Sequence, residues 1–184
     1  MSSVEAVFDL IRVVLLFVTV VVAATTDTLS RRVPNVVTYP AMALGLALGF
    51  GMGQVGLDGS LTQHNLLSHA LGLLIASGIF LVAWWAGGVK GGEVKLAGAV
   101  GALGGLQFAV AAMFWSSLVG ALMALWVLLL RGRLLEGLRR SVRYAMMLRA
   151  EPAPKDDPAR LSIPYAVAIA FGTLWTFFLV EASR

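Results

Sequence analysis

The chain has 184 residues, of which 59% are hydrophobic and 13% charged, with a formal net charge of +4. Because a soluble domain carries roughly 25% charged residues and no long apolar runs, this composition excludes that class and predicts a polytopic membrane protein. The chain has no cysteine and only two histidines, so disulfides, a thiolate nucleophile and a cysteine-ligated zinc site are excluded, and we expect no cofactor.

Apolar runs predict six transmembrane helices, each of which needs roughly 20 residues. The first is interpreted as a retained helix and not as a signal peptide, because two acidic residues and only one arginine precede its apolar run. The fourth is short and rich in glycine and alanine, which is typical of close helix packing in lipid. We expect a tight turn at Gln107 between the fourth and the fifth. The expected spans are 4–26, 36–51, 66–86, 93–106, 108–130 and 163–180.

Residues 131–160 differ from the spans. Their first two-thirds combine arginines with apolar residues at helical spacing, and the remainder contains three prolines. We therefore expect a cytoplasmic basic amphipathic helix on the anionic inner leaflet, followed by a linker. This segment belongs to a single membrane-embedded domain, residues 1–184.

The basic residues orient the spans. Arg31 and Arg32 mark the first connection as cytoplasmic, and alternation then places twelve of the 14 Lys and Arg residues inside, leaving Arg12 and Arg184. This distribution accounts for the positive charge without a nucleic-acid partner. It also puts Asp27, after the first span, and Glu93, at the start of the fourth, at the same membrane face.

Two carboxyl groups that lie close together tend to share one proton. One can then act as a base on water while the other donates to a carbonyl, which is aspartic-protease chemistry. The helix dipole favours an anionic Glu93 and disfavours an anionic Asp27, so we expect Asp27 to carry the proton. A purely structural alternative stays open, in which Glu93 only stabilises its first helical turn and Asp27 is a local cap or a partner of Arg31.

Three motifs, in order along the chain, resemble the type IV prepilin peptidases, which are GxGD-type intramembrane aspartic endopeptidases. The first is DTLSRRVPN at 27–35, similar to the family's Asp, basic loop and Ile/Val-Pro-Asn. The second is KGGEVKLAGAVGALGG at 90–105, similar to GxGDxKLLAALGAxxG, and the third is IPYAVAIAFG at 163–172.

The resemblance implies that Asp27 and Glu93 are the catalytic pair. It implies a prepilin or pseudopilin substrate, whose short basic leader is cut at the cytoplasmic face of the bacterial inner membrane. Because no CxxC pairs occur, the chain resembles the short form that serves tight-adherence (Flp) pili and lacks the region tied to N-methylation. The other residues that match the motifs and support the site are Gly91, Gly92, Lys95, Arg31, Arg32, Pro34, Asn35, Pro164 and Tyr165.

The chain departs from the family pattern at two positions. Glu93 stands where the family has aspartate, and Lys90 stands where its motif begins with glycine. The extra methylene moves the carboxyl group by about 1 Å, and such a shift can cost on the order of 10²-fold in rate. Two other functions therefore stay open as alternatives: a catalytically impaired homologue that binds pilin segments, and a small proton-coupled transporter.

Two further roles are expected from the motif residues. Lys95 either tunes the carboxyl pair or is a snorkelling lysine at the inner face. Pro164 and Tyr165 are expected to be structural, at the start of the last helix.

Overall fold

The computed structural model describes residues 3–53, 65–85, 88–132 and 164–181, and every regular element among them is helical. The predicted all-α fold class is therefore confirmed. Apart from Arg131 and Gly132, the predicted amphipathic helix and linker lie outside the described residues, as do residues 54–64 between the second and third predicted spans. The elements are α1 (Ser3–Ser30), α2 (Asn35–Gly53), α3 (Leu66–Trp85), α4 (Gly91–Leu130), α6 (Tyr165–Thr176) and the π-helical η1 (Phe177–Glu181).

Three helices are long and apolar enough to cross a membrane: Ala6–Ser30, Leu66–Trp85 and Gly91–Leu130. Two more apolar stretches, Asn35–Gly51 and Tyr165–Leu179, are shorter. The chain is thus a helical membrane protein, as its composition predicts, while the number of six spans stays a prediction.

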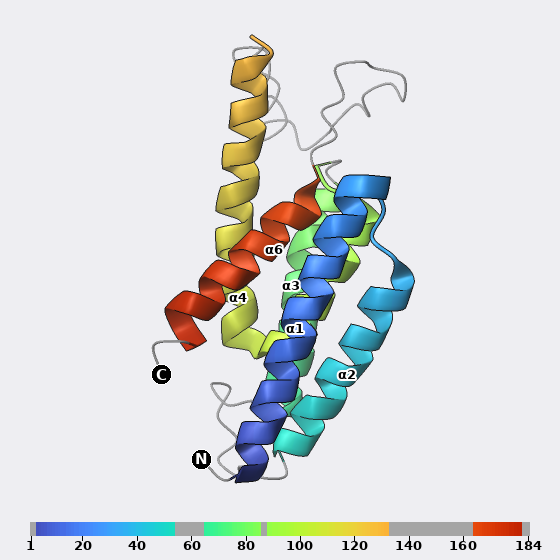
Figure 1. Ribbon diagram of the computed structural model, residues 1–184, viewed down its shortest axis with the longest axis vertical. Helices are drawn as coiled ribbons and strands as arrows, with labels where there is room; N and C mark the ends of the chain where they lie inside the picture. Colours follow the sequence, from blue (N-terminus) through green and yellow to red (C-terminus); the bar gives the residue numbers. More distant parts are fainter. Residues whose placement is uncertain (1–2, 54–64, 86–87, 133–163, 182–184) are drawn as a thin grey trace.

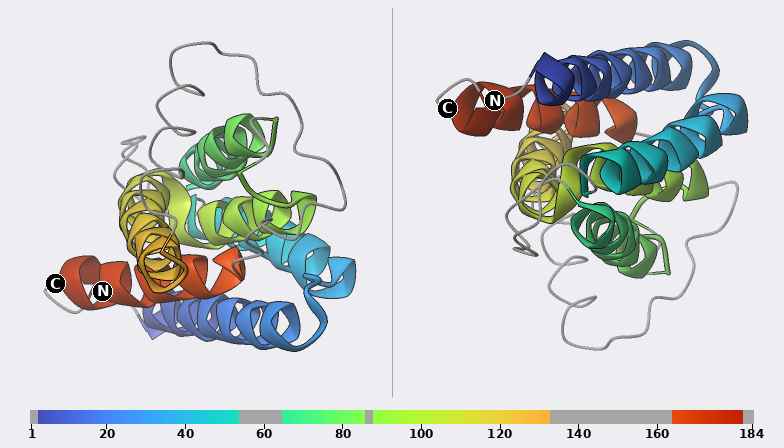
Figure 2. Two further views of the ribbon diagram at one scale, coloured as in Figure 1. Left: turned by 90° about the horizontal axis from the view of Figure 1, so that it is seen from above. Right: turned by 90° about the horizontal axis from the view of Figure 1, so that it is seen from below.

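The first half of α4 lies in the middle of the bundle. Seen along its long axis, α3 lies on one side of it, α1 and α6 lie side by side on the other, and α2 flanks them (Figures 1 and 2). The residues from Leu96 to Gly105 are all buried, which agrees with this central position. The first half of α4, from Leu96 to Gly105, is therefore enclosed by neighbouring helices.

A single break divides α4 at Gly105, whose φ of 76° and ψ of 176° are far from helical values. Glycine adopts this positive φ without a steric penalty. The break thus lies at Gly105, and the turn predicted at Gln107 was placed too late. Two neighbouring residues of α3 bond to backbone groups around the break: Ser68 Oγ accepts from the Leu106 N–H over 3.1 Å, and His69 Nδ1 lies 2.6 Å from the Ala102 carbonyl oxygen.

After the break the chain turns back on itself, and the second half of α4 runs toward the end where α4 begins (Figure 1). Glu93 in the first half accepts a hydrogen bond from the backbone of Tyr165, and Gly120 in the second half packs against the Tyr165 ring. In a straight helix these two residues would be about 40 Å apart. The hairpin therefore brings both halves of α4 to the same residue of α6.

Small residues allow the close helix packing that the sequence predicts. A Cβ added to Gly101 would collide with the backbone of Gly72, and one added to Gly72 would collide with the backbones of Gly101 and Gly105. Here α3 and α4 approach without intervening side chains, and this prediction is confirmed.

Helix α1 continues to Ser30, so its predicted end at residue 26 was wrong. Side-chain hydroxyls in this last stretch donate to carbonyls three or four residues earlier, for example Thr28 to Ala24 and Ser30 to Thr26. The helix ends where Arg31 takes a left-handed conformation with φ of 56° and donates its N–H to the Asp27 carbonyl over 2.9 Å.

Candidate active site

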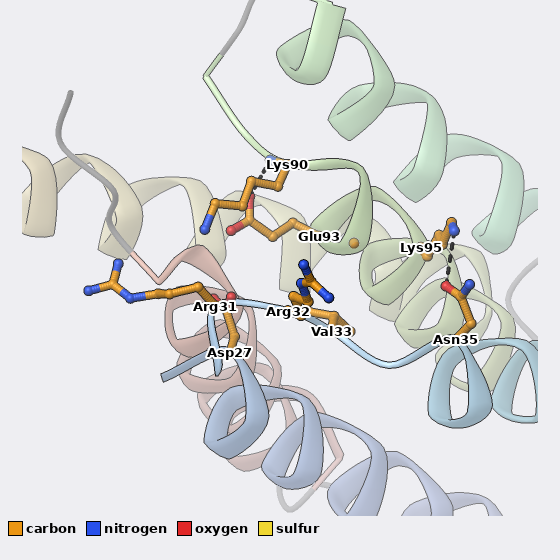
Figure 3. A pocket seen from close by; sticks show the side chains of 9 residues that line it. Asp27, Arg31, Arg32, Val33, Asn35, Lys90, Glu93 and Lys95 are labelled. Carbon is orange, nitrogen blue, oxygen red and sulfur yellow. Dashed lines mark hydrogen bonds between the residues drawn. The ribbon is translucent and has the colours of Figure 1, made fainter. Parts of the chain in front are cut away.

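A pocket of about 270 Å³ opens where the end of α1, the start of α4 and the connection between α1 and α2 meet (Figure 3). It contains both predicted catalytic acids and most of the predicted motif residues. The structure therefore brings together residues more than 60 positions apart in the sequence. The lining consists of Asp27, Arg31, Arg32, Val33, Asn35, Lys90, Gly92, Glu93 and Lys95.

Both acids that line this pocket are buried. Asp27 is 1% exposed and belongs to the last turns of α1, while Glu93 is 2% exposed and belongs to the first turn of α4. Their carboxylate groups point toward one another in Figure 3 and are close enough to interact electrostatically. The predicted juxtaposition of the two side chains is therefore observed.

Glu93 accepts two backbone hydrogen bonds through different oxygens. Its Oε2 accepts the Lys90 N–H over 2.6 Å, and its Oε1 accepts the Tyr165 N–H over 3.2 Å. The first bond is the returning half of a capping box, in which the side chain of the third helical residue reaches back to the N-cap. Glutamate is the acid that suits this reach, so the extra methylene has a structural role at this position.

Asp27 is in a different environment. Its Oδ2 is buried and has no hydrogen-bond partner within the part of the chain that the structure describes. A buried carboxylate oxygen with no donor is costly when ionised, whereas a protonated carboxyl group is cheaper to bury. The two acids therefore differ in their hydrogen bonding: two backbone N–H groups donate to Glu93, and no described group donates to this oxygen of Asp27.

Cationic side chains surround the acids. Arg31, Arg32 and Lys90 are exposed at the pocket, and Lys95 is partly buried. In Figure 3 the Lys90 side chain runs beside that of Glu93. With four cationic and two acidic side chains, the lining of the pocket has a positive formal net charge.

Lys95 makes two contacts to the start of α2. Its Nζ donates to Asn35 Oδ1 over 3.0 Å and lies 5.1 Å from the centre of the Tyr39 ring. These contacts connect two helices, which neither of the roles predicted for this lysine describes.

The two glycines before Glu93 are not equivalent. A Cβ on Gly92 would lie 3.1 Å from Val33 Cβ, a tight contact with the connection between α1 and α2. A Cβ on Gly91 would meet only Trp84 Nε1 at 3.8 Å, an ordinary contact. Both glycines are helical, although the sequence predicts them in a loop, and only Gly92 is needed for close approach.

Two prolines precede helices, as predicted. The Pro34 carbonyl accepts the N–H groups of Val37 and Thr38 at the start of α2. The Pro164 carbonyl accepts the N–H of Val167 in the first turn of α6.

Sequence reasoning missed the backbone contribution of Tyr165 to the site. Its phenol ring packs edge-on against Phe80, as a structural role predicts, but its N–H reaches Glu93. A local signal existed only for the other donor, because Lys90 and Glu93 have capping-box spacing. Across the described ranges, no three His, Cys, Asp or Glu side chains gather closely enough to hold a metal ion.

The family comparison agrees with the site. The type IV leader peptidase family matches residues 14–125, which is more than half of the chain and includes both Asp27 and Glu93. The chain belongs to the type IV leader peptidase family. No curated protein and no solved structure matched the chain. Family membership supports a leader-peptidase function in general and, with the apolar helices, a membrane location.

Proposed function

We propose that this protein is a membrane-embedded aspartic endopeptidase that removes the leader of prepilins or pseudopilins at the cytoplasmic face of the bacterial inner membrane. Asp27 and Glu93 are its catalytic pair. The observation that supports this most directly is the opposition of two buried carboxyl groups, from different helices, in one pocket at one end of the bundle. The absence of CxxC pairs in the sequence favours the short form that serves tight-adherence pili as the nearest functional type.

The proposed reaction uses the unequal environments of the acids. Glu93, which accepts two backbone N–H groups, takes a proton from a water molecule, whose oxygen attacks the scissile carbonyl carbon. Asp27, which holds the shared proton, donates it to the carbonyl oxygen. As the tetrahedral intermediate collapses, Glu93 gives its proton to the leaving amide nitrogen, the C–N bond breaks, and Asp27 recovers the proton from the hydroxyl group.

The position of the acids argues against a transporter. An acid that relays protons across a membrane is expected at mid-membrane depth, whereas Asp27 lies three positions before the last residue of α1. Glu93 is the third residue of α4, so both acids lie at helix ends. The second alternative, a binding homologue without activity, differs from the enzyme only in turnover.

Co-expression with a prepilin that carries a basic leader tests the proposal. We expect the wild-type chain to shorten the prepilin on an immunoblot, and Asp27→Asn and Glu93→Gln each to abolish the shortening. Thr28→Ala is a suitable control, because the exposed Thr28 hydroxyl bonds only within its own helix, to the Ala24 carbonyl. Processing that survives both acid substitutions would exclude the mechanism, and wild-type protein that binds the prepilin without cutting it would favour the binding homologue.

A further inference from the structure

We propose that Lys95 is a positioning residue for the catalytic pair. With Asn35 and Tyr39 it forms a clamp that fastens the start of α2 to the start of α4 and thereby sets the separation of Asp27 and Glu93. The catalytic part of this inference rests on the proposed function, whereas the clamp itself can be tested without it.

The contacts of the clamp are specific. The Lys95 ammonium group donates to the Asn35 side-chain oxygen over 3.0 Å and lies 5.1 Å from the centre of the Tyr39 ring, one helical turn further along α2. An ammonium group that faces both an acceptor and an aromatic ring is held more narrowly than a lysine that only reaches for solvent. The hydrogen bond joins residues 60 positions apart.

The clamp affects Asp27 through the short connection between α1 and α2. Only residues 31–34 separate the end of α1 from the start of α2. The connection packs against α4 at Val33, which lies over Gly92, and the first residue of α2, Asn35, accepts the hydrogen bond from Lys95. A shift of the start of α2 is therefore passed on to the last turn of α1, which carries Asp27.

Glu93 is anchored independently of the clamp. Its two oxygens accept the backbone N–H groups of Lys90, the residue before α4, and of Tyr165 in α6, and neither donor lies on α1 or α2. Loosening the clamp would thus move one acid and leave the other in place. Since a misplacement of about 1 Å can cost on the order of 10²-fold in rate, a positioning role has a measurable effect.

Two other roles for Lys95 make different predictions. A lysine that tunes the acids through its charge would shift the pH dependence of the rate when the charge is removed, whether or not Asn35 is present. A lysine that only snorkels would tolerate replacement, and its effect would not depend on Asn35. A clamp instead couples the two residues, because either substitution breaks the same hydrogen bond.

The kinetic test is a double-mutant cycle with Lys95→Met and Asn35→Leu, assayed by leader removal from a purified prepilin. We expect each substitution to lower kcat by about 10-fold to 10²-fold with little change in KM, and the double variant to be no slower than the slower single variant. Lys95→Arg keeps a hydrogen-bond donor and should retain more activity than Lys95→Met. Asn35→Asp keeps an acceptor and should retain more activity than Asn35→Leu. The pH optimum should not move.

A distance measurement tests the clamp whether or not the chain cleaves prepilins. The chain has no native cysteine, so Leu29→Cys, near the end of α1, and Gly91→Cys, at the start of α4, can be spin-labelled selectively. We expect one narrow distance distribution with Lys95 present, a broader or shifted one with Lys95→Met, and recovery with Lys95→Arg. An unchanged distribution in Lys95→Met would overturn the clamp, as would additive kinetic effects or a shifted pH optimum. Failure of the wild-type chain to cut prepilins would instead overturn the proposed function.

Discussion

The backbone N–H of Tyr165 donates to Oε1 of Glu93 over 3.2 Å and so joins the first residue of α6 to the first turn of α4. The other oxygen of Glu93 accepts the N–H of Lys90. The acid proposed for catalysis is therefore also a structural link between two helices. Substitutions at this position should affect both stability and turnover.

Glu93→Asp should lower both properties, although it restores the residue that the family motif contains. The shorter side chain withdraws the carboxylate from the Lys90 and Tyr165 N–H groups, and loss of a helix-capping interaction costs about 0.5–2 kcal/mol. Processing should fall on the order of 10-fold or more because the acid also moves away from Asp27. Thermal unfolding in detergent and prepilin cleavage measure the two effects. A gain in processing would show instead that the native glutamate is a handicap.

The shared proton should be found on Asp27. Two N–H donors favour the ionised form of Glu93, whereas Oδ2 of Asp27 has no donor among the described residues. Infrared spectroscopy near neutral pH should show a protonated carboxyl band that disappears in Asp27→Asn and persists in Glu93→Gln. The reverse pattern would assign the proton to Glu93 and contradict the proposed roles.

Gly92→Ala should reduce processing by about 10-fold, whereas Gly91→Ala should be nearly silent. The new methyl group at position 92 presses on Val33 and displaces the connection between α1 and α2, while the one at position 91 makes only an ordinary contact with Trp84. Both substitutions bring the same gain in helix propensity, up to about 1 kcal/mol, so the pair is a matched control. Equal activities of the two variants would show that the approach of Val33 does not matter.

Gly101→Ala should destabilise the fold, whereas Gly78→Ala should not. A Cβ on Gly101 collides with the backbone of Gly72, and a backbone cannot give way as a flexible side chain can; overpacking of this kind costs about 1–3 kcal/mol. A Cβ on Gly78 would meet nothing within 4 Å. Melting temperatures in detergent should therefore fall for the first variant and stay the same or rise for the second.

Helices and the acid pair were predictable from the sequence because they depend on local patterns. Apolar runs located α2 and α3 to within two residues of their observed ends. Charge asymmetry predicted Asp27 and Glu93 at one membrane face, and the structure places both in one pocket. The predicted end of α1 was too early, because hydroxyl side chains such as those of Thr28 and Ser30 continue the helix past the apolar run.

Contacts between distant segments were not predictable in this way. Nothing near Tyr165 indicates that its N–H meets an acid 72 positions earlier, and nothing near Lys95 indicates that it bonds to Asn35. The position of the break in α4 is a similar case. Of the many glycines in this region, Gly105 takes the positive φ, and side chains of α3, distant in the sequence, bond to the backbone beside it.

This break has a consequence for how the protein is assembled in the bilayer. Lipid offers no hydrogen bonds to the peptide groups that the reversal at Gly105 exposes, and Ser68 and His69 of the preceding helix supply them. The hairpin of α4 therefore cannot reach its folded conformation in the membrane alone. It depends on hydrogen bonds from α3, the helix synthesised just before it. A chain split between α3 and α4 should yield an active site only if the two fragments meet in the same membrane.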